Sequence, residues 1–199
     1  MNKSSKFTDE QGAILSSALK HAPQCGWNDT LIRKLKDEYG IVPMTRYCPN
    51  GVDDLTKLFA DWADNEMLAA MEQDDVAEMK VREKITHGVR ARLMALSTHR
   101  NAFKASLKYM MHPLRGMHLK KLTWQTADRL WYAAGDRATD YNHYTKRVLL
   151  SGVLASTTLY WLRDTSDNYE KTWAFLDRRI QNVMSVGGYI SKIKNRFSE

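Results

Sequence analysis

Apolar residues recur along this chain at spacings of three and four, the period expected of one face of an α-helix. The pattern covers most of the sequence in segments that short polar or Gly- and Pro-containing connections separate. No segment has the sustained two-residue alternation of a half-buried β-strand. We therefore predict an all-α fold.

Polar residues mark where the first two helices begin and end. Thr8 and Gln11 have the spacing of a capping box, and Asn28 can cap a second helix that Gly40 ends. Longer apolar patterns predict further helices over residues 55–71, 75–97, 99–112, 119–134, 144–163 and 169–183. Because residues 144–163 are apolar on nearly every side, we expect this helix to be central.

The order of these segments, two short helices before a long helical body, follows that of TetR-type regulators. We predict that residues 1–50 form a degenerate helix-turn-helix, residues 51–188 a helical ligand-binding body and residues 189–199 a short basic amphipathic tail, all in one structural domain. Pro43 and the cluster at 47–51 leave too little room for a two-turn reading helix, so residues 41–51 are expected to be irregular.

The distribution of charge argues against nucleic acid as a partner. Residues 51–80 carry two basic and nine acidic side chains, whereas residues 81–150 carry fourteen basic and four acidic ones. Phosphate contacts dominate DNA affinity, and the basic excess lies away from the segment that would read DNA. The alternative, a TetR-type transcriptional regulator with an apolar ligand pocket, predicts DNA binding that depends on Arg33, Lys34 and Lys36.

The sequence has no recognisable catalytic motif. It lacks His-Glu-x-x-His, Glu-x-x-His, a Gly-rich phosphate loop and Gly-x-Ser-x-Gly. Asp140 and His143 could contribute to a metal site, but nothing nearby in the sequence supplies the other ligands. We predict no catalytic residue, metal or cofactor. Two cysteines and no signal or transit pattern predict a cytoplasmic location.

The segment Gly135–Arg147, GDRATDYNHYTKR, combines aromatic and charged side chains between two apolar helices. Lys146 and Arg147 are expected to open the second of these helices. Rigid aromatic side chains bury much area at low entropic cost, so this segment could be a recognition surface. A helix-capping turn with incidental aromatics is the alternative.

Apolar stripes on several helices could enclose a lipid, although a close-packed core gives the same pattern. The candidate lipid-binding residues are Phe103, Leu107, Met110, Met111, Trp131, Leu154, Trp161 and Trp173. The apolar run 149–162 would extend roughly 21 Å as a helix, which is too short for a bilayer core of ~30 Å.

The tail after Gly187-Gly188 has one apolar side and several cations. Its candidate membrane-surface residues are Tyr189, Ile190, Lys192, Ile193, Lys194, Arg196 and Phe197. Such a segment can lie on an anionic membrane, and the ridge Arg100, Lys104 and Lys108 could reinforce this attraction. Docking of the tail on the domain and a solvated ridge are the alternatives.

Four runs resemble the ubiquinone-biosynthesis accessory proteins of the Coq-nine family, lipid-binding relatives of the TetR fold. The runs are residues 126–131, 135–147, 157–164 and 173–180, and bacterial members are the closest in length. The resemblance implies a homodimer that holds an isoprenoid quinone precursor or phospholipid and presents it to the demethoxyubiquinone hydroxylase. It also implies peripheral association with a membrane, the inner membrane in a bacterium.

The resemblance further implies a partner-binding patch at Leu130, Asp140, His143 and Tyr144. His143 departs from the family's usual Trp or Tyr at that position. A histidine still stacks, but it buries less area and can carry a positive charge that Trp and Tyr lack.

Overall fold

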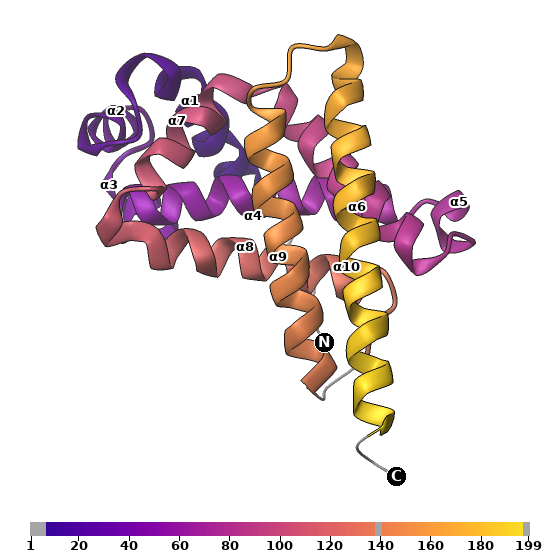
Figure 1. Ribbon diagram of the computed structural model, residues 1–199. Helices are drawn as coiled ribbons and strands as arrows, with labels where there is room; N and C mark the ends of the chain where they lie inside the picture. The colour runs from indigo at the N-terminus through magenta and orange to yellow at the C-terminus, as the bar shows by residue number, and fades with distance from the viewer. Residues whose placement is uncertain (1–6, 138–140, 197–199) are drawn as a thin grey trace. The chain divides into compact units, whose positions relative to one another are not determined.

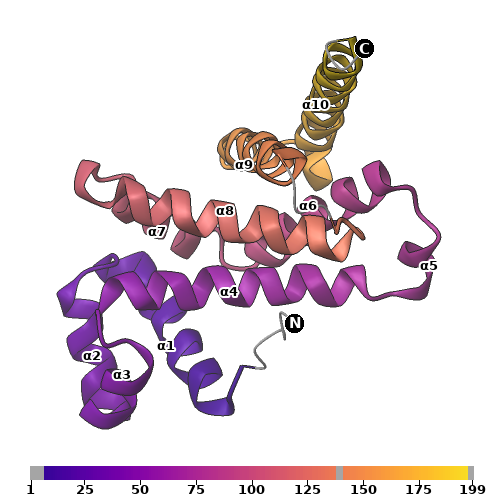
Figure 2. The same ribbon diagram turned by 90° about the horizontal axis from the view of Figure 1, so that it is seen from below.

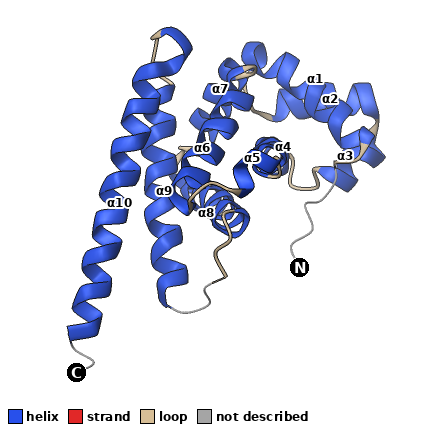
Figure 3. Ribbon diagram, turned by 90° about the vertical axis from the view of Figure 1, so that its right-hand side faces the viewer, coloured by secondary structure: helices blue, strands red, loops and turns tan. Residues whose placement is uncertain are grey.

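The computed structural model describes residues 7–137 and 141–196, and for residues 74, 141–142 and 184–196 it describes the backbone alone. Helices and short connections make up the described chain, in which no strand occurs (Figure 3). The prediction of an all-α fold is confirmed. The α-helices are α1 (Asp9–Cys25), α2 (Asp29–Tyr39), α3 (Ile41–Tyr47), α4 (Val52–Met71), α5 (Asp74–Ala77), α6 (Val81–Ser97), α7 (Arg100–Met110), α8 (Gly116–Ala133), α9 (Tyr141–Trp161) and α10 (Glu170–Arg196), with short 3-10 helices η1 (Pro113–Arg115) and η2 (Asp167–Tyr169).

The predicted helix starts are largely confirmed. Thr8 and Gln11 form the capping box of α1, and the Asn28 side chain accepts hydrogen bonds from the backbone amides of Thr30 and Leu31 at the start of α2. Two boundaries were wrong. The single helix expected over residues 75–97 is divided into α5 and α6, and α9 begins at Tyr141, ahead of the expected start at Tyr144.

The expectation of an irregular segment after Gly40 was also wrong, because Ile41–Tyr47 forms the seven-residue helix α3. Pro43 is tolerated since it lies in the first turn, where backbone amides have no partner within the helix. Gly40 joins α2 to α3 with φ +83°, a conformation that glycine adopts without strain. The segment after Gly40 is therefore more helical than the sequence indicated.

The chain forms two compact units, which do not follow the predicted boundaries at residues 50 and 188. Unit 1 comprises residues 1–67 and 94–122, and unit 2 comprises residues 68–93 and 123–199. Helix α10 continues through Gly187-Gly188 to Arg196, so the predicted tail extends a helix that begins in unit 2.

An aromatic cluster forms the core of unit 1. Phe59 on α4 stacks on Trp27, with ring centroids 5.8 Å apart, and meets Phe103 of α7 edge to face. The Trp27 indole donates to the carbonyl oxygen of Ala102 over 2.9 Å, which joins the turn between α1 and α2 to α7. Figure 2 shows α1, α2 and α3 next to one another in this unit.

In unit 2, α9 and α10 run side by side in opposite directions (Figure 1). Leu150, Val153 and Trp161 of α9 are buried, as are Leu176 and Ile180 of α10. The expectation that α9 is covered on all sides was wrong. Tyr144, Val148 and Leu159 are 61%, 59% and 47% exposed, so α9 has an apolar side that its own chain leaves open.

A buried carboxylate joins these two helices. Asp164, after the end of α9, accepts hydrogen bonds from the backbone amides and the hydroxyls of both Ser166 and Thr172, at 2.5 to 2.9 Å. Burial raises the pKa of Asp164, but these hydrogen bonds outweigh that effect and hold the pKa well below its usual range. The carboxylate thus caps the first turn of α10 at the positive end of the helix dipole.

Candidate functional site

The segment between α8 and α9 begins with a helix-ending turn at Gly135. This residue has φ +96°, and the following amide of Asp136 donates back to the carbonyl oxygen of Trp131 over 3.0 Å. Such a backbone reversal terminates a helix and favours glycine. The turn holds Asp136 beside the second turn of α9.

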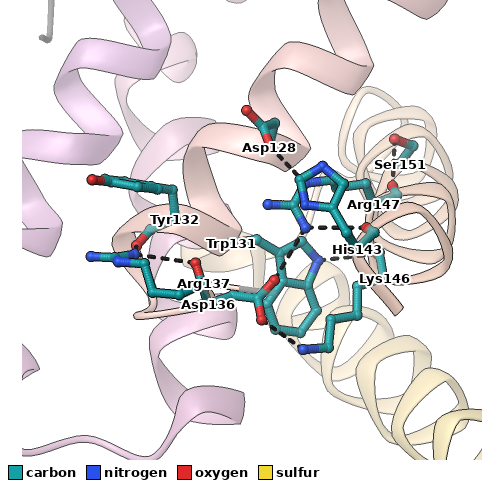
Figure 4. A network of polar contacts seen from close by, with 9 residues as sticks. All are labelled: Asp128, Trp131, Tyr132, Asp136, Arg137, His143, Lys146, Arg147 and Ser151. Atoms are coloured by element: carbon teal, nitrogen blue, oxygen red, sulfur yellow. Dashed lines mark hydrogen bonds and ion pairs between the residues drawn. The ribbon is translucent and has the colours of Figure 1, made fainter. Parts of the chain in front are cut away.

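Arg147 is the centre of a polar network that connects α8, the turn and α9 (Figure 4). Its side chain is only 3% exposed, and its guanidinium group donates to Asp128 over 2.5 Å and to Asp136 over 3.1 Å. A third bond, of 3.1 Å, goes to the carbonyl oxygen of His143. Arg147 therefore lies inside α9 and does not open it, contrary to our expectation.

Lys146 and Trp131 extend this network. The Lys146 ammonium contacts Asp136 at 2.6 Å and lies 5.4 Å from the centre of the Trp131 ring. The Trp131 indole donates to the carbonyl oxygen of Lys146 over 3.0 Å. Asp136 thus receives two cations, and the first two turns of α9 are held firmly against the end of α8.

Aromatic side chains lie on the outside of this network. The Tyr144 ring is in edge contact with His143, with centroids 5.2 Å apart, and its centre lies 6.3 Å from that of Trp124 on α8. Tyr144 is 61% exposed, whereas His143 and Trp124 are half-buried. We call these three residues the aromatic surface. Trp124 was missed by the sequence analysis, although it lies close to the motif in the preceding helix.

One predicted partner-binding residue lies in the core. Leu130 is fully buried and packs closely on Gly88 of α6. A Cβ atom added at Gly88 would lie only 2.4 Å from a methyl carbon of Leu130. Its side chain therefore packs beneath the surface and supports α8 against α6, and its assignment as a partner contact was wrong. Asp140, another predicted contact, lies outside the described residues.

The predicted lipid-binding residues do not come together in one place. In unit 1, Phe103, Leu107 and Met110 are buried on the inner side of α7, whereas Met111 is 59% exposed at its end. In unit 2, Trp131, Leu154 and Trp161 are buried, and Trp173 lies in a row of edge contacts that passes through Tyr169 to Trp161.

Trp131 borders a void of only about 20 Å³ in unit 2. The other lining residues are Val81, Arg82, Ile85, Leu150, Val153, Ile180 and Val183. Pockets for organic ligands usually measure about 300–1,000 Å³, so this void cannot hold an isoprenoid chain. Trp131, Leu154 and Trp161 are buried in the core, and their assignment to a lipid site stays a prediction.

A larger hollow lies on unit 2 where α9 ends and α10 begins. It has a volume of about 440 Å³. One side is apolar, with the rings of Tyr160 and Phe175 stacked 4.6 Å apart, and Arg163 and Lys171 supply positive charge. We call this hollow the α9–α10 groove; its remaining lining residues are Ser156, Leu159, Asp164 and Thr165.

The candidate membrane residues of the tail give less structural information. Tyr189, Ile190, Lys192, Ile193, Lys194 and Arg196 belong to the helical backbone of α10, but their side chains lie outside the described part, as does Phe197 entirely. No helix among the described residues combines the length and the hydropathy needed to cross a bilayer.

The described side chains offer no cluster of three or more His, Cys, Asp or Glu that could hold a metal ion. Of the two cysteines, Cys48 is buried, and burial raises the pKa of its thiol to about 12. This thiol therefore stays protonated near neutral pH.

Comparison with known proteins gives related sequences over nearly the whole chain. Residues 117–187 match the sequence model of the COQ9 family. The mitochondrial ubiquinone biosynthesis protein COQ9 of Xenopus tropicalis is 27% identical over 191 residues, which cover 92% of this chain and 60% of the relative. The human protein of the same name is 25% identical over 194 residues, covering 93% of this chain and 61% of the relative. The chain thus matches about 60% of the length of these relatives.

A solved structure supports the assignment of the fold. The TetR transcriptional regulator from Nitrosomonas europaea superposes with a TM-score of 0.71, over 89% of this chain and 99% of that protein, at 21% sequence identity. At this identity the likeness concerns the fold alone. The predicted resemblance is confirmed: this all-α chain has a TetR-like fold and is similar in sequence to the COQ9 proteins.

Proposed function

We propose that this chain is a non-catalytic accessory protein of ubiquinone biosynthesis, which binds an isoprenoid quinone precursor or phospholipid and presents it to the demethoxyubiquinone hydroxylase at a membrane surface. The shared name of its relatives supports a role in this pathway. The observation that carries the partner-binding part is the exposed Tyr144 on the rigid Arg147 network. Buried aromatic anchors dominate many protein interfaces, and a preorganised anchor loses little entropy on binding.

Replacing Tyr144 with Ala is expected to weaken capture of the hydroxylase by about tenfold or more, as removal of an aromatic hot spot does. The melting temperature should change little, because the side chain is 61% exposed. Pull-down titration with purified hydroxylase and a thermal melt measure the two effects. Tyr132→Ala is the matched control, since Tyr132 is a 46% exposed tyrosine on α8. Equal loss of binding in both variants, or unchanged binding in Tyr144→Ala, would contradict the proposed contact.

For the lipid, the proposal assigns the α9–α10 groove as the binding site. The α9–α10 groove, about 440 Å³, is within the usual range for ligand sites, whereas the void beside Trp131 is about 20 Å³. The Tyr160–Phe175 stack can contact an aromatic ring or an acyl chain, and Arg163 and Lys171 can contact an anionic headgroup.

Lipid extraction followed by mass spectrometry tests this site. Leu159→Asp should reduce the co-purifying lipid about tenfold, because a carboxylate facing an apolar ligand loses its hydration without gaining a partner. Val148→Asp is the control, because Val148 is an exposed apolar residue of α9 outside the groove. An extract of the unmodified protein without isoprenoid or phospholipid would exclude the carrier function, and equal losses in both variants would exclude the groove.

The homodimer and the attachment of the tail to the membrane stay predictions.

A DNA-binding regulator is not favoured by the surface of α3. Ile41 and Val42 at the start of this helix are 70% and 69% exposed. Reading of base edges requires polar side chains that match their donors and acceptors.

A further inference from the structure

Three apolar side chains are strongly exposed where α7 turns into α8. Met111 is 59%, Leu114 89% and Met117 75% exposed, and Leu114 is the most exposed large apolar side chain of the described residues. Figure 2 shows this connection as a short turn at which the chain reverses direction. We call these residues the Met–Leu turn. Single exposed apolar residues are common, but a contiguous group indicates an interaction surface.

Contacts beneath the Met–Leu turn hold it in place. Arg115 in its middle turns inward, and its guanidinium group lies 4.2 Å from the centre of the Tyr109 ring. The Tyr109 hydroxyl donates to Asp53 on α4 over 2.9 Å. At the start of α8, His118 and Thr56 are hydrogen-bonded at 3.0 Å. Arg115 and Tyr109 thus contact α4 of unit 1, while the apolar side chains of the turn remain exposed, as does His112.

Exposed lysines lie on the same helix faces as the exposed methionines. On α7, Lys104 and Lys108 precede Met111 by seven and three residues, and on α8 Lys120 and Lys121 follow Met117 by three and four. At these spacings, residues share one side of a helix. All four lysines are exposed. The Met–Leu turn is thus an apolar tip with positive charge on both flanks.

The charge of the surrounding sequence selects the kind of partner. Residues 94–122, the part of unit 1 that contains the turn, carry six Lys and Arg and no Asp or Glu. The carboxylate in contact with the turn, Asp53, already accepts from Tyr109 and lies 3.9 Å from Arg115. An anionic bilayer satisfies both features at once, since its phosphates attract the lysines and its acyl region accepts the apolar tip.

We infer that the Met–Leu turn inserts into anionic membranes and is a membrane-binding site of this chain. The proposed function places the chain at a membrane surface and assigns its attachment to the tail beyond Gly188. The Met–Leu turn is a separate membrane-binding site in unit 1. With both sites, the chain contacts the membrane through this turn as well as through its terminal helix. Failure of this turn to insert would leave lipid capture and hydroxylase docking untouched, because those are measured with the Leu159 and Tyr144 variants of α9.

Vesicle sedimentation tests the inference with the full chain. Leu114→Gln combined with Met117→Gln should weaken binding to vesicles of phosphatidylglycerol and phosphatidylcholine about tenfold, because insertion then buries little apolar area. The control is Ile41→Gln with Val42→Gln, a pair of exposed apolar residues on α3 with exposures of 70% and 69%. Replacing Lys104, Lys108, Lys120 and Lys121 by Gln should reduce the salt dependence of binding.

A fluorescent probe reports insertion directly. Leu114→Cys in a Cys25→Ser background, labelled with a polarity-sensitive nitrobenzoxadiazole group, should gain intensity and shift to the blue when these vesicles are added. The same label on Val42→Cys should not respond. Unchanged vesicle binding in the Leu114/Met117 variant, or a label at position 114 that stays in water, overturns the inference. Loss of hydroxylase binding with normal vesicle binding would do so too, and would identify a protein-docking surface.

Discussion

Replacement of Arg147 by Met should lower the free energy of unfolding by about 3–5 kcal/mol, the usual effect of removing one partner from a buried ion pair. The Asp136 side chain is only 8% exposed, so it would lose its buried cation, whereas Lys146, the other cation it contacts, is more exposed. Chemical denaturation followed by circular dichroism measures the change. The same variant should also weaken hydroxylase capture, because the backbone below Tyr144 loses its anchor.

Lys146→Met provides the matched control. Lys146 contacts the same carboxylate, but its side chain is 38% exposed and its ammonium can be replaced by water. We therefore expect a loss of about 1 kcal/mol or less. If the two variants lost the same stability, the network would not depend on the buried guanidinium group, and the rigid support of the aromatic surface would be disproved.

Replacement of Asp164 by Ala is expected to cost about 2–4 kcal/mol of stability. The change removes four hydrogen bonds to a carboxylate that is 5% exposed, and it leaves the buried Thr172 hydroxyl and amide without their acceptor. Hydrogen exchange should show the loss first in the opening turn of α10. Protection of that turn equal to that of the unmodified chain would contradict the capping role.

The dependence of stability on pH gives an independent measurement. The hydrogen bonds lower the pKa of Asp164 in the folded state below its unfolded value of about 3.9. The carboxylate therefore stabilises the fold fully above that unfolded value, and this contribution is lost as the pH falls towards the lower folded pKa. Asp164→Asn should flatten the acid limb of the stability profile between about pH 5 and pH 2. If the Asp164→Asn variant lost stability at low pH as the unmodified chain does, carboxylates other than Asp164 would determine the acid unfolding.

The local features of the sequence predicted much of the fold. The capping box at Thr8, the cap at Asn28 and the long apolar stripes depend on residues within a few positions of one another, and each was found in the structure. The error at Ile41–Tyr47 also has a local cause. Pro43 breaks a helix in its interior but not in its first turn, and the pattern did not indicate where this helix begins.

The candidate site was predictable only in part. Aromatic residues in the segment 135–147 indicated a surface, and Tyr144 is indeed exposed. The spacing did not indicate that Leu130 is buried or that Arg147 is the centre of a polar network. The burial of Leu130 depends on packing against Gly88, and the position of Arg147 depends on one carboxylate of α8 and one of the following turn. The cap formed by Asp164 had a local signal, Asp-x-Ser ahead of a helix, which the sequence analysis did not use.

By itself, the sequence determined the helical class, most helix boundaries and the resemblance to the COQ9 proteins, because helical periodicity, capping and family motifs depend on neighbouring residues. The tertiary structure decided which apolar side chains are covered. It buried Leu130, Trp131 and Trp161, reduced the void beside Trp131 to about 20 Å³, and left Tyr144, Leu114 and Met117 exposed. Hydropathy is the same for a covered and an uncovered side chain, and only contact with residues distant in the sequence separates core from surface.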